Sequence, residues 1–190
     1  YASVQGWKPL GLTGVATDAK GRRVYAINDR PAAEVYGEWL GKKLKPKVIA
    51  WDEGLTNPLA IVDIAGELWL RHPKEIGEDG SITFFSAVPE NAVLEITSGK
   101  KEDLVEAARD AGENMKICDA KSFSFIFDCV ARKVYLGDLT AKELSAFNES
   151  IKGESAGFYT YGEQAPTTKS VVGHRNQTFT AITFFDELII

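Results

Sequence analysis

Residues 157–184, GFYTYGEQAPTTKSVVGHRNQTFTAITF, contain the side chains best suited to binding chemistry. The carboxylate of Glu163 stands in an expected turn, and a polar cluster with Asn176 and Thr178 precedes the last apolar run. A loop-held carboxylate opposite amides and hydroxyls can recognise a small polar molecule, and no residue here is typical of an activated nucleophile. The alternative is that Glu163 and Asn176 only satisfy the backbone of turns between two neighbouring strands.

A complementary positive charge stands at Arg71, which ends an apolar run just before His72-Pro73. A guanidinium can clamp a ligand carboxylate with two hydrogen bonds, whereas the alternative is an exposed ion pair with an acidic residue. Arg71 with Glu163 would complement a zwitterion such as an amino acid. Aromatic side chains would wall the apolar part of such a pocket; the candidates are Phe158, Tyr161 and Phe179.

The two cysteines, Cys118 and Cys129, flank an apolar run of strand length. We expect both to be buried reduced thiols, which suits a cytoplasmic protein without requiring one. Arg132 follows Cys129 closely, and a nearby guanidinium could lower the pKa of that thiol and make it reactive. The alternative is that Cys129 is a small buried side chain at a strand end.

Several kinds of catalytic site are excluded by the motifs. The two histidines, His72 and His174, lie in no nucleophile signature, and no Cys or His pair has metal-ligand spacing. The sequence has no Walker loop and no GxGxxG after a strand. We therefore predict no enzyme; an enzymatic alternative would require a strongly shifted pKa at Glu163 in a closed cleft.

Composition points to a globular domain. The 190 residues are 44% hydrophobic and 26% charged, which is ordinary for a chain that buries a core. The net charge of −5 argues against nucleic acid or an anionic membrane surface as partner. The basic stretch at residues 42–47 is expected to be a solvated linker after a helix. No run has the length of a membrane span, and no signal peptide is visible.

In the first half of the chain, period-2 patterns dominate. We expect a hairpin of residues 14–19 and 22–27, then a helix that Asp29 caps, Pro31 opens and Gly41 ends. Two further strand pairs follow. The expected pairs are residues 59–64 with 68–70, and residues 81–88 with 92–97.

In the second half, helical spacing is clearer. Residues 101–115 predict a helix, and Thr140 to Glu143 form a capping-box pattern before a helix that runs to about Ile151. The nearly continuous apolar run 123–130 predicts a central strand. The last strands are expected at residues 157–161 and 179–185. Together these elements predict an α+β fold with a largely antiparallel sheet and about three interspersed helices.

Four segments of the sequence resemble the FIST sensory domain, in the order typical of that family. They are VYAINDRPAAEVYGEWLG (24–41), ELWLRHPKEIGEDGSITFFSAVPENAVLEI (67–96), FSFIFDCVARKVYLG (123–137) and the stretch 157–184. The resemblance implies the C-terminal FIST half from residue 46 to 190, preceded by the tail of the N-terminal half in residues 1–45. We therefore expect the chain to be a portion of a longer polypeptide.

The resemblance implies a non-enzymatic sensor that binds a small polar metabolite such as an amino acid. It would pass a conformational change to a signalling output domain or protein such as a kinase or cyclase. The predicted ligand-binding residues are Arg71, Cys129, Arg132, Phe158, Tyr161, Gly162, Glu163, Asn176 and Thr178.

Two alternatives stay open. The first is a haem-binding nitric-oxide sensor, whose axial ligand would be His174, His72 or the Cys129 thiolate. The family often places His directly before Asn-Gln-Thr, where this chain has Arg175. The second is an interaction or scaffold domain without a small ligand, for which an exposed Trp7 and the apolar residues 188–190 would supply the contact surface.

Overall fold

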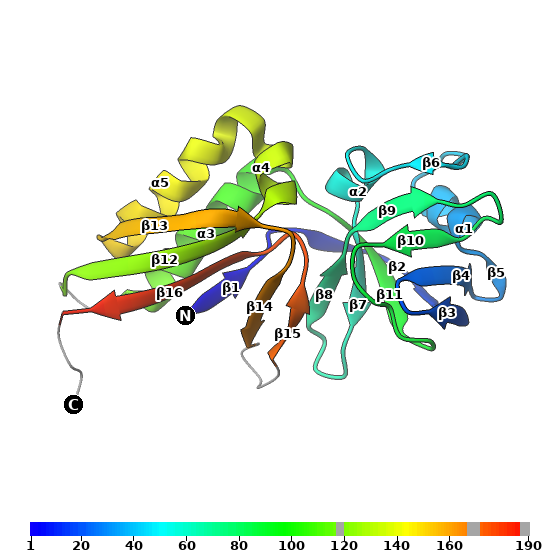
Figure 1. The fold of residues 1–190 in the computed structure, drawn as a ribbon, viewed down its shortest axis with the longest axis horizontal. Coiled ribbons are helices and arrows are strands. Elements are labelled where there is room, and N and C mark those ends of the chain that lie inside the picture. Colours follow the sequence, from blue (N-terminus) through cyan, green and yellow to red (C-terminus); the bar gives the residue numbers. More distant parts are fainter. Residues whose placement is uncertain (117–119, 167–171, 187–190) are drawn as a thin grey trace. The chain divides into compact units, whose positions relative to one another are not determined.

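A computed structural model describes residues 1–116, 120–166 and 172–186 (Figure 1). Contacts divide the chain into unit 1, Tyr1–Trp7 with Gly99–Ile190, and unit 2, Lys8–Ser98. Along the described ranges, no helix is both long and apolar enough to cross a membrane. The family boundary expected between residues 45 and 46 is a different kind of division and stays a prediction.

Unit 1 is a four-stranded sheet in the order β1-β16-β12-β13, with helices on one face (Figure 1). Strand β12 runs antiparallel to β16 and parallel to β13. A hairpin of β14 and β15 forms a separate small sheet. The elements are β1 (Ala2–Val4), α3 (Lys101–Met115), β12 (Ser122–Cys129), α4 (Val130–Leu136), a 3₁₀ turn (Gly137–Leu139), α5 (Thr140–Ile151), β13 (Glu154–Thr160), β14 (Glu163–Pro166), β15 (Val172–Arg175) and β16 (Phe179–Phe185).

The two faces of this sheet differ because side chains alternate along each strand. On β12, Ile126 points toward α3 and α5 and joins a core that includes Phe147 and Phe179. The alternate residues of β12, Phe123 and Phe125, point to the opposite face of the sheet and are exposed. Strand β12 is thus the central strand that the apolar run predicted, but it is buried on one face only.

Unit 2 contains two antiparallel sheets and packs its own core around Ile27, Tyr36, Phe84 and Leu94. One sheet has the order β3-β4-β10-β9-β6, and the other β2-β11-β7-β8. The elements are β2 (Lys8–Val15), β3 (Asp18–Lys20), β4 (Arg23–Ile27), β5 (Arg30–Pro31), α1 (Ala32–Trp39), β6 (Lys47–Val48), α2 (Glu53–Thr56), β7 (Leu59–Val62), β8 (Leu68–Arg71), β9 (Pro73–Ile76), β10 (Ile82–Phe84) and β11 (Val93–Ser98).

The predicted α+β class with largely antiparallel sheets is confirmed. Helix α3 has the predicted bounds, α5 spans the predicted second helix, and β7 with β8 forms the predicted hairpin. The predicted pairing of residues 81–88 with 92–97 is wrong. Strand β10 pairs with β4 and β9, whereas β11 pairs with β2 and β7 in the other sheet.

Three local predictions are also corrected. Asp29 does not cap α1, because it lies in a tight turn with a positive φ of 59° between β4 and β5. No capping box forms at α5, because Thr140 Oγ1 donates to the Gly137 carbonyl and Glu143 turns into the interior. Trp7 is buried, not exposed, with its ring against Tyr135. Residues 188–190 lie outside the described ranges.

Candidate functional site

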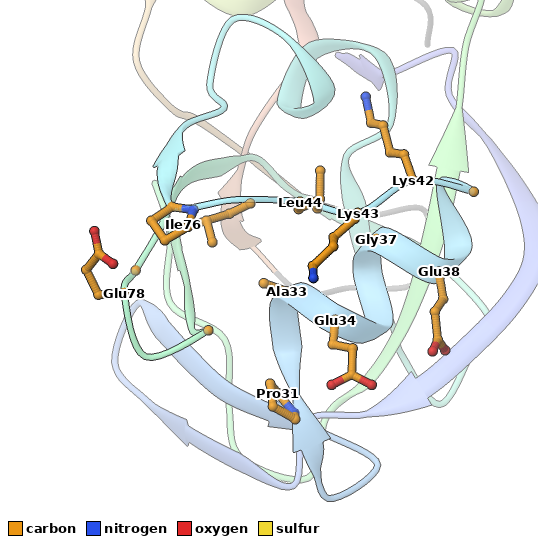
Figure 2. A pocket seen from close by; sticks show the side chains of 14 residues that line it. Pro31, Ala33, Glu34, Gly37, Glu38, Lys42, Lys43, Leu44, Ile76 and Glu78 are labelled. Carbon is orange, nitrogen blue, oxygen red and sulfur yellow. The ribbon is translucent and has the colours of Figure 1, made fainter.

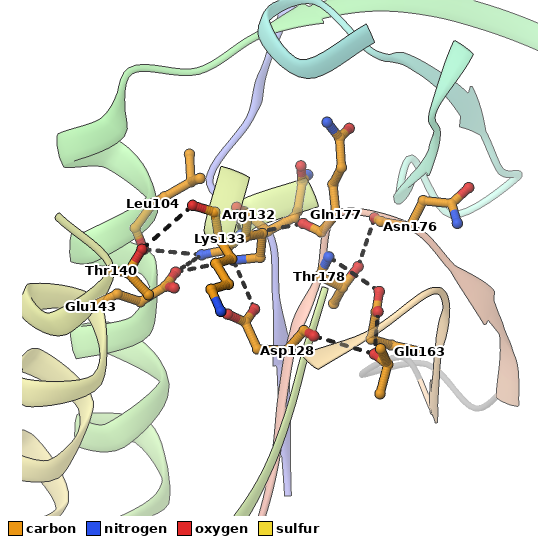
Figure 3. A network of polar contacts seen from close by, with 12 residues as sticks. Leu104, Asp128, Arg132, Lys133, Thr140, Glu143, Glu163, Asn176, Gln177 and Thr178 are labelled. Atoms are coloured by element: carbon orange, nitrogen blue, oxygen red, sulfur yellow. Dashed lines mark hydrogen bonds and ion pairs between the residues drawn. The ribbon is translucent and has the colours of Figure 1, made fainter. Parts of the chain in front are cut away.

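Arg132 is the centre of a buried polar network in unit 1 (Figure 3). Because α4 begins directly where β12 ends, the first turn of α4 places Arg132 beneath the end of the sheet, where its side chain is fully buried. Its Nε donates to Glu143 Oε1 at 3.0 Å, and its Nη2 also binds that oxygen. Burying a guanidinium requires such partners, since an unpaired buried charge is costly.

Backbone carbonyls from separate segments complete the coordination of Arg132. Its Nη1 donates to the carbonyls of Gln5 and Gln177, the latter at 3.2 Å, and its Nη2 donates to Leu104 O at 3.2 Å. The ring of Trp7 lies 5.7 Å from the guanidinium carbon. Arg132 therefore ties the N-terminal segment, α3, α5 and the turn before β16 to one point.

Asp128 is the second acid of this network and comes from the same strand end. It is 2% exposed, and its Oδ1 lies 3.3 Å from Arg132 Nε. Within the described residues, neither of its carboxylate oxygens accepts a hydrogen bond. Burial, and then the neighbouring charge of Glu143, hold the pKa of Asp128 well above its usual range.

Glu163 is the third buried acid and lies at the start of β14. Its Oε1 accepts a hydrogen bond from Thr160 Oγ1 at 2.6 Å, and its Oε2 accepts one from the Thr178 backbone N–H at 3.4 Å. Burial raises the pKa of Glu163 to about 7, against the opposing effect of these hydrogen bonds and of Arg132. The carboxyl group thus titrates near neutral pH.

Cys129 is a buried thiol, as predicted for that residue, and the reactive alternative is wrong. Burial, and then the charge of Glu163, raise the pKa of Cys129 to about 12. Arg132 does not activate the thiol, because its guanidinium points toward Glu143 and the backbone carbonyls. Cys118 lies outside the described residues.

A small pocket of about 110 Å³ adjoins Asp128 on the helix-facing side of the sheet. It is lined by Ile126 and Asp128 of β12, Leu144 of α5 and residues 155–159 of β13. The ammonium of Lys133 lies 4.7 Å from the centre of the Tyr159 ring, so a positive charge stands beside a lining residue. The pocket therefore combines a buried acid, an apolar wall and a nearby ammonium.

A larger pocket of about 690 Å³ lies in unit 2, between α1, the 41–46 segment and the turn after β9 (Figure 2). Its floor includes Ala33, Leu44 and Ile76, and Figure 2 shows Lys43 and Glu78 at its walls. No buried ionisable group lines it, and none of the predicted ligand-binding residues does. We therefore place the candidate site beside Asp128, where the unusual electrostatics are found.

Several of the predicted ligand-binding residues lie in or beside the Arg132 network, although the sequence did not predict their contacts. Cys129, Arg132, Glu163, Asn176 and Thr178 are all buried in unit 1. Asn176 Nδ2 donates to the Arg175 carbonyl, and Thr178 Oγ1 donates to the Asn176 carbonyl, so both satisfy the turn before β16.

The remaining predicted residues lie outside the Arg132 network, although Phe158 lines the small pocket. Phe158 and Tyr161 are exposed. A Cβ on Gly162 would lie 2.1 Å from the exposed His174 ring, so a larger residue there requires that ring to move. Arg71 ends β8 in unit 2, where its Nε donates to Ala87 O at 2.7 Å. Its pairing with Glu163 across a ligand stays a prediction.

Sequence reasoning missed the two acids that contact Arg132. Asp128 is the one acid in the apolar run 123–130, and that exception was the available signal. Glu143 was assigned to a capping box, which accounts for a glutamate at this position without predicting that its side chain is buried. The β14–β15 hairpin and helix α4, which shape the same region, were also missed.

Two of the three side chains considered as axial haem ligands, His72 and Cys129, are buried in this structure. Burial lowers the pKa of His72 to about 4, and its Nε2 lies 2.7 Å from Ala50 O. The Cys129 thiol stays protonated at neutral pH for the reasons given above.

Comparison with known proteins gives one match. The family model for the FIST C domain matches residues 32–166, which is more than half of the chain, and it confirms the resemblance seen in the sequence. No curated protein and no solved structure matches the chain.

Proposed function

The chain belongs to the FIST C domain family, and we therefore propose that it is a sensory module whose small ligand binds in the pocket beside Asp128. Domains of this family are sensory and ligand-binding and are not known as catalytic. The observation that carries the proposal is a pocket-lining carboxylate that is 2% exposed and shares the guanidinium of Arg132, 3.3 Å from its Oδ1, with the buried Glu143. Two buried carboxylates on one guanidinium are costly to keep ionised, and a further positive charge beside Asp128 would lower that cost.

The charges around the pocket favour a ligand that carries an ammonium group. Asp128 and Glu143 are two buried acids that share the guanidinium of Arg132, and Glu163 is a third buried acid whose charge also acts on Asp128. A ligand ammonium at Asp128 would add the positive charge that these carboxylates require to ionise. Lys133, beside Tyr159, is positioned to attract a carboxylate of the same ligand.

An amino acid has both groups, and the pocket volume favours a small one. A volume of about 110 Å³ corresponds to only a few water molecules, so a long side chain has no room in it. Ligand binding would pass to a signalling output partner such as a kinase or cyclase. That partner, and a cytoplasmic location, are proposed from the family resemblance alone.

Thermal unfolding in the presence of small amino acids tests the site. A ligand at about a hundred times its Kd stabilises the protein by about 2.7 kcal/mol, which raises the Tm. We expect Asp128→Asn to abolish the shift, because the amide loses the negative charge but keeps the shape. The matched control is Asp138→Asn, an exposed acid in the same unit, which should keep the full shift.

Lys43→Ala separates this site from the pocket of unit 2. If Lys43→Ala removes the Tm shift and Asp128→Asn does not, the ligand occupies the larger pocket. If no small amino acid or amine shifts the Tm of the wild-type chain, the proposed ligand class is wrong.

A further inference from the structure

The sheet of unit 1 exposes an aromatic face, opposite the face that the helices cover. The aromatic face consists of side chains that point the same way from β12, β13 and β16: Phe123, Phe125, Phe127, Phe158, Ile182 and Phe184. Apart from the partly buried Phe127, these side chains are between 38% and 63% exposed. Apolar patches of this kind mark interaction surfaces.

The rings of this face are already arranged in contact with one another. Phe125 lies edge-on to Phe123 and Phe184, with ring centres 5.2 Å and 6.2 Å apart. Phe127 and Phe158 form a similar pair at 5.3 Å across β12 and β13. Packed rings lose little conformational entropy on binding, so the face is preorganised for a partner.

Charge is nearly absent from the aromatic face. Among the residues of β12, β13 and β16 that share its side of the sheet, Glu154 at the start of β13 is the charged one. A surface without charge offers nothing for a partner of opposite charge to recognise. It is, however, compatible with an identical copy of itself, because a two-fold axis brings the same patch together from both sides.

The size of the face fits a dimer. A fully exposed phenylalanine presents about 200 Å², so the exposed fractions leave on the order of 450 Å² of apolar area uncovered. A standard interface buries about 800 Å² per partner, of which roughly 60% is apolar. The apolar area of the face therefore matches what one side of a stable dimer requires.

We propose that the aromatic face is the contact surface between two copies of this chain, which pack sheet against sheet about a two-fold axis. Phe125 lies at the centre, since it contacts a ring on its own strand and one on β16. The dimer requires no ligand, although Phe158 of the aromatic face also contributes to the lining of the small pocket.

Sedimentation velocity between about 1 μM and about 100 μM tests the dimer. We expect the sedimentation of the wild-type chain to give a mass of twice the 20.8 kDa of one chain. Phe125→Ser with Phe184→Ser should raise the dimer Kd at least about a hundredfold, because two central aromatic side chains are lost. Ile64→Ser, a fully exposed apolar residue of unit 2, is the matched control and should leave the dimer intact.

The proposal is overturned if the wild-type chain stays monomeric over this range, or if the double variant remains dimeric. Circular dichroism and the Tm establish that the variants are folded. If the double variant does not fold, Phe158→Ser on the edge strand takes its place, with the same expected rise in Kd and the same contrary outcome. A partner of another kind would appear as a monomeric wild type.

Discussion

At the scale of single residues, the arrangement around Arg132 raises the question of how Asp128 and Glu143 are buried with one guanidinium, close to a third buried acid, Glu163. Glu143 has the closest contact, and Asp128 and Glu163 keep raised pKa values. Burial of a second or third carboxylate favours its protonated form, because one guanidinium cannot offset several desolvated negative charges. The network is therefore sensitive to protons in the neutral range, and a ligand cation would compete with those protons.

The first prediction concerns the pH dependence of stability at Glu163. Its pKa is about 4.3 in the unfolded chain and about 7 in the folded protein, so the folded state binds more protons between these values. The free energy of unfolding should therefore contain a part that is fully present below about pH 4 and lost as the pH rises to about 7. In Glu163→Gln this part, worth about 3–4 kcal/mol, should be absent.

Urea unfolding at several pH values measures the difference between the wild type and Glu163→Gln. The difference reports Glu163 together with its effect on Asp128, whose pKa the charge of Glu163 also raises, whereas the opposite contribution of His72 is common to both proteins. Glu149→Gln, an exposed acid on α5, should follow the wild-type curve. A Glu163→Gln curve parallel to that of the wild type would contradict the raised pKa.

Sequence patterns predicted the residue types of this network better than their contacts. Glu163 was predicted as a site residue because it is a carboxylate in a turn beside amides and hydroxyls, and Arg132 because it follows Cys129 closely; both are buried in this region. Their partners were not predicted, because the choice between Glu143 and any other acid depends on where α5 packs. Trp7 was wrongly predicted to be exposed for the same reason, because the residues that cover it, Tyr135 and Arg132, are distant from it in the sequence.

At the scale of elements, the close packing of α3 on α5 positions Glu143 beneath the sheet. Gly112 is the contact residue, since a Cβ there would lie 2.7 Å from the Phe147 carbonyl and 2.8 Å from Ser150 Cβ. Both atoms belong to α5, so a larger side chain would push the helices apart. The absence of a side chain at residue 112 is thus what allows the helices to approach.

The second prediction is that Gly112→Ala destabilises the protein by about 1–3 kcal/mol, through overpacking. The direction is informative, because Gly→Ala in an unhindered helix is normally stabilising by about 0.5–1 kcal/mol. Denaturant unfolding measures this change in the free energy of unfolding. The control is Glu113→Ala at the exposed neighbouring position, which we expect to change stability by less than about 0.5 kcal/mol. A stabilised Gly112→Ala variant would show that the helices are not in this contact.

Elements with strong local patterns were the predictable ones. Helix α3 shows clear helical spacing, and β7 with β8 needed only a local turn. The pairing of β10 and β11 failed because strands adjacent in sequence joined different sheets, a choice made by long-range packing. Helix α4 is short and follows β12 without a turn residue, so no local signal separated the two.

At the scale of the whole molecule, unit 1 is built from both ends of the chain. Strand β1 pairs with β16, and the Gln5 carbonyl accepts a hydrogen bond from Arg132. Trp7 is 2% exposed and packs on Tyr135. The N-terminal segment is therefore structural for unit 1, although residues 8–98 separate it from the rest of that unit.

The third prediction follows from this division. Trp7→Ala should lower the free energy of unfolding of unit 1 by about 3–5 kcal/mol, as large core truncations do. Hydrogen exchange should accelerate in β12 and β16, whereas β7 and β11 of unit 2 should keep their wild-type rates, because each unit has its own core. The control is Trp51→Ala, a half-exposed residue of unit 2, which should leave β12 and β16 unchanged.

Exchange measured by mass spectrometry reads both units in one experiment. Faster exchange confined to unit 1 would mean that the segment before residue 8 and the segment after residue 98 fold as one body. Equal acceleration in β7 and β11 would instead mean that the two units unfold together, so that the division by contacts is not a division in stability. In the expected case, the ligand pocket and the aromatic face, both in unit 1, depend on the first seven residues of the chain for their stability.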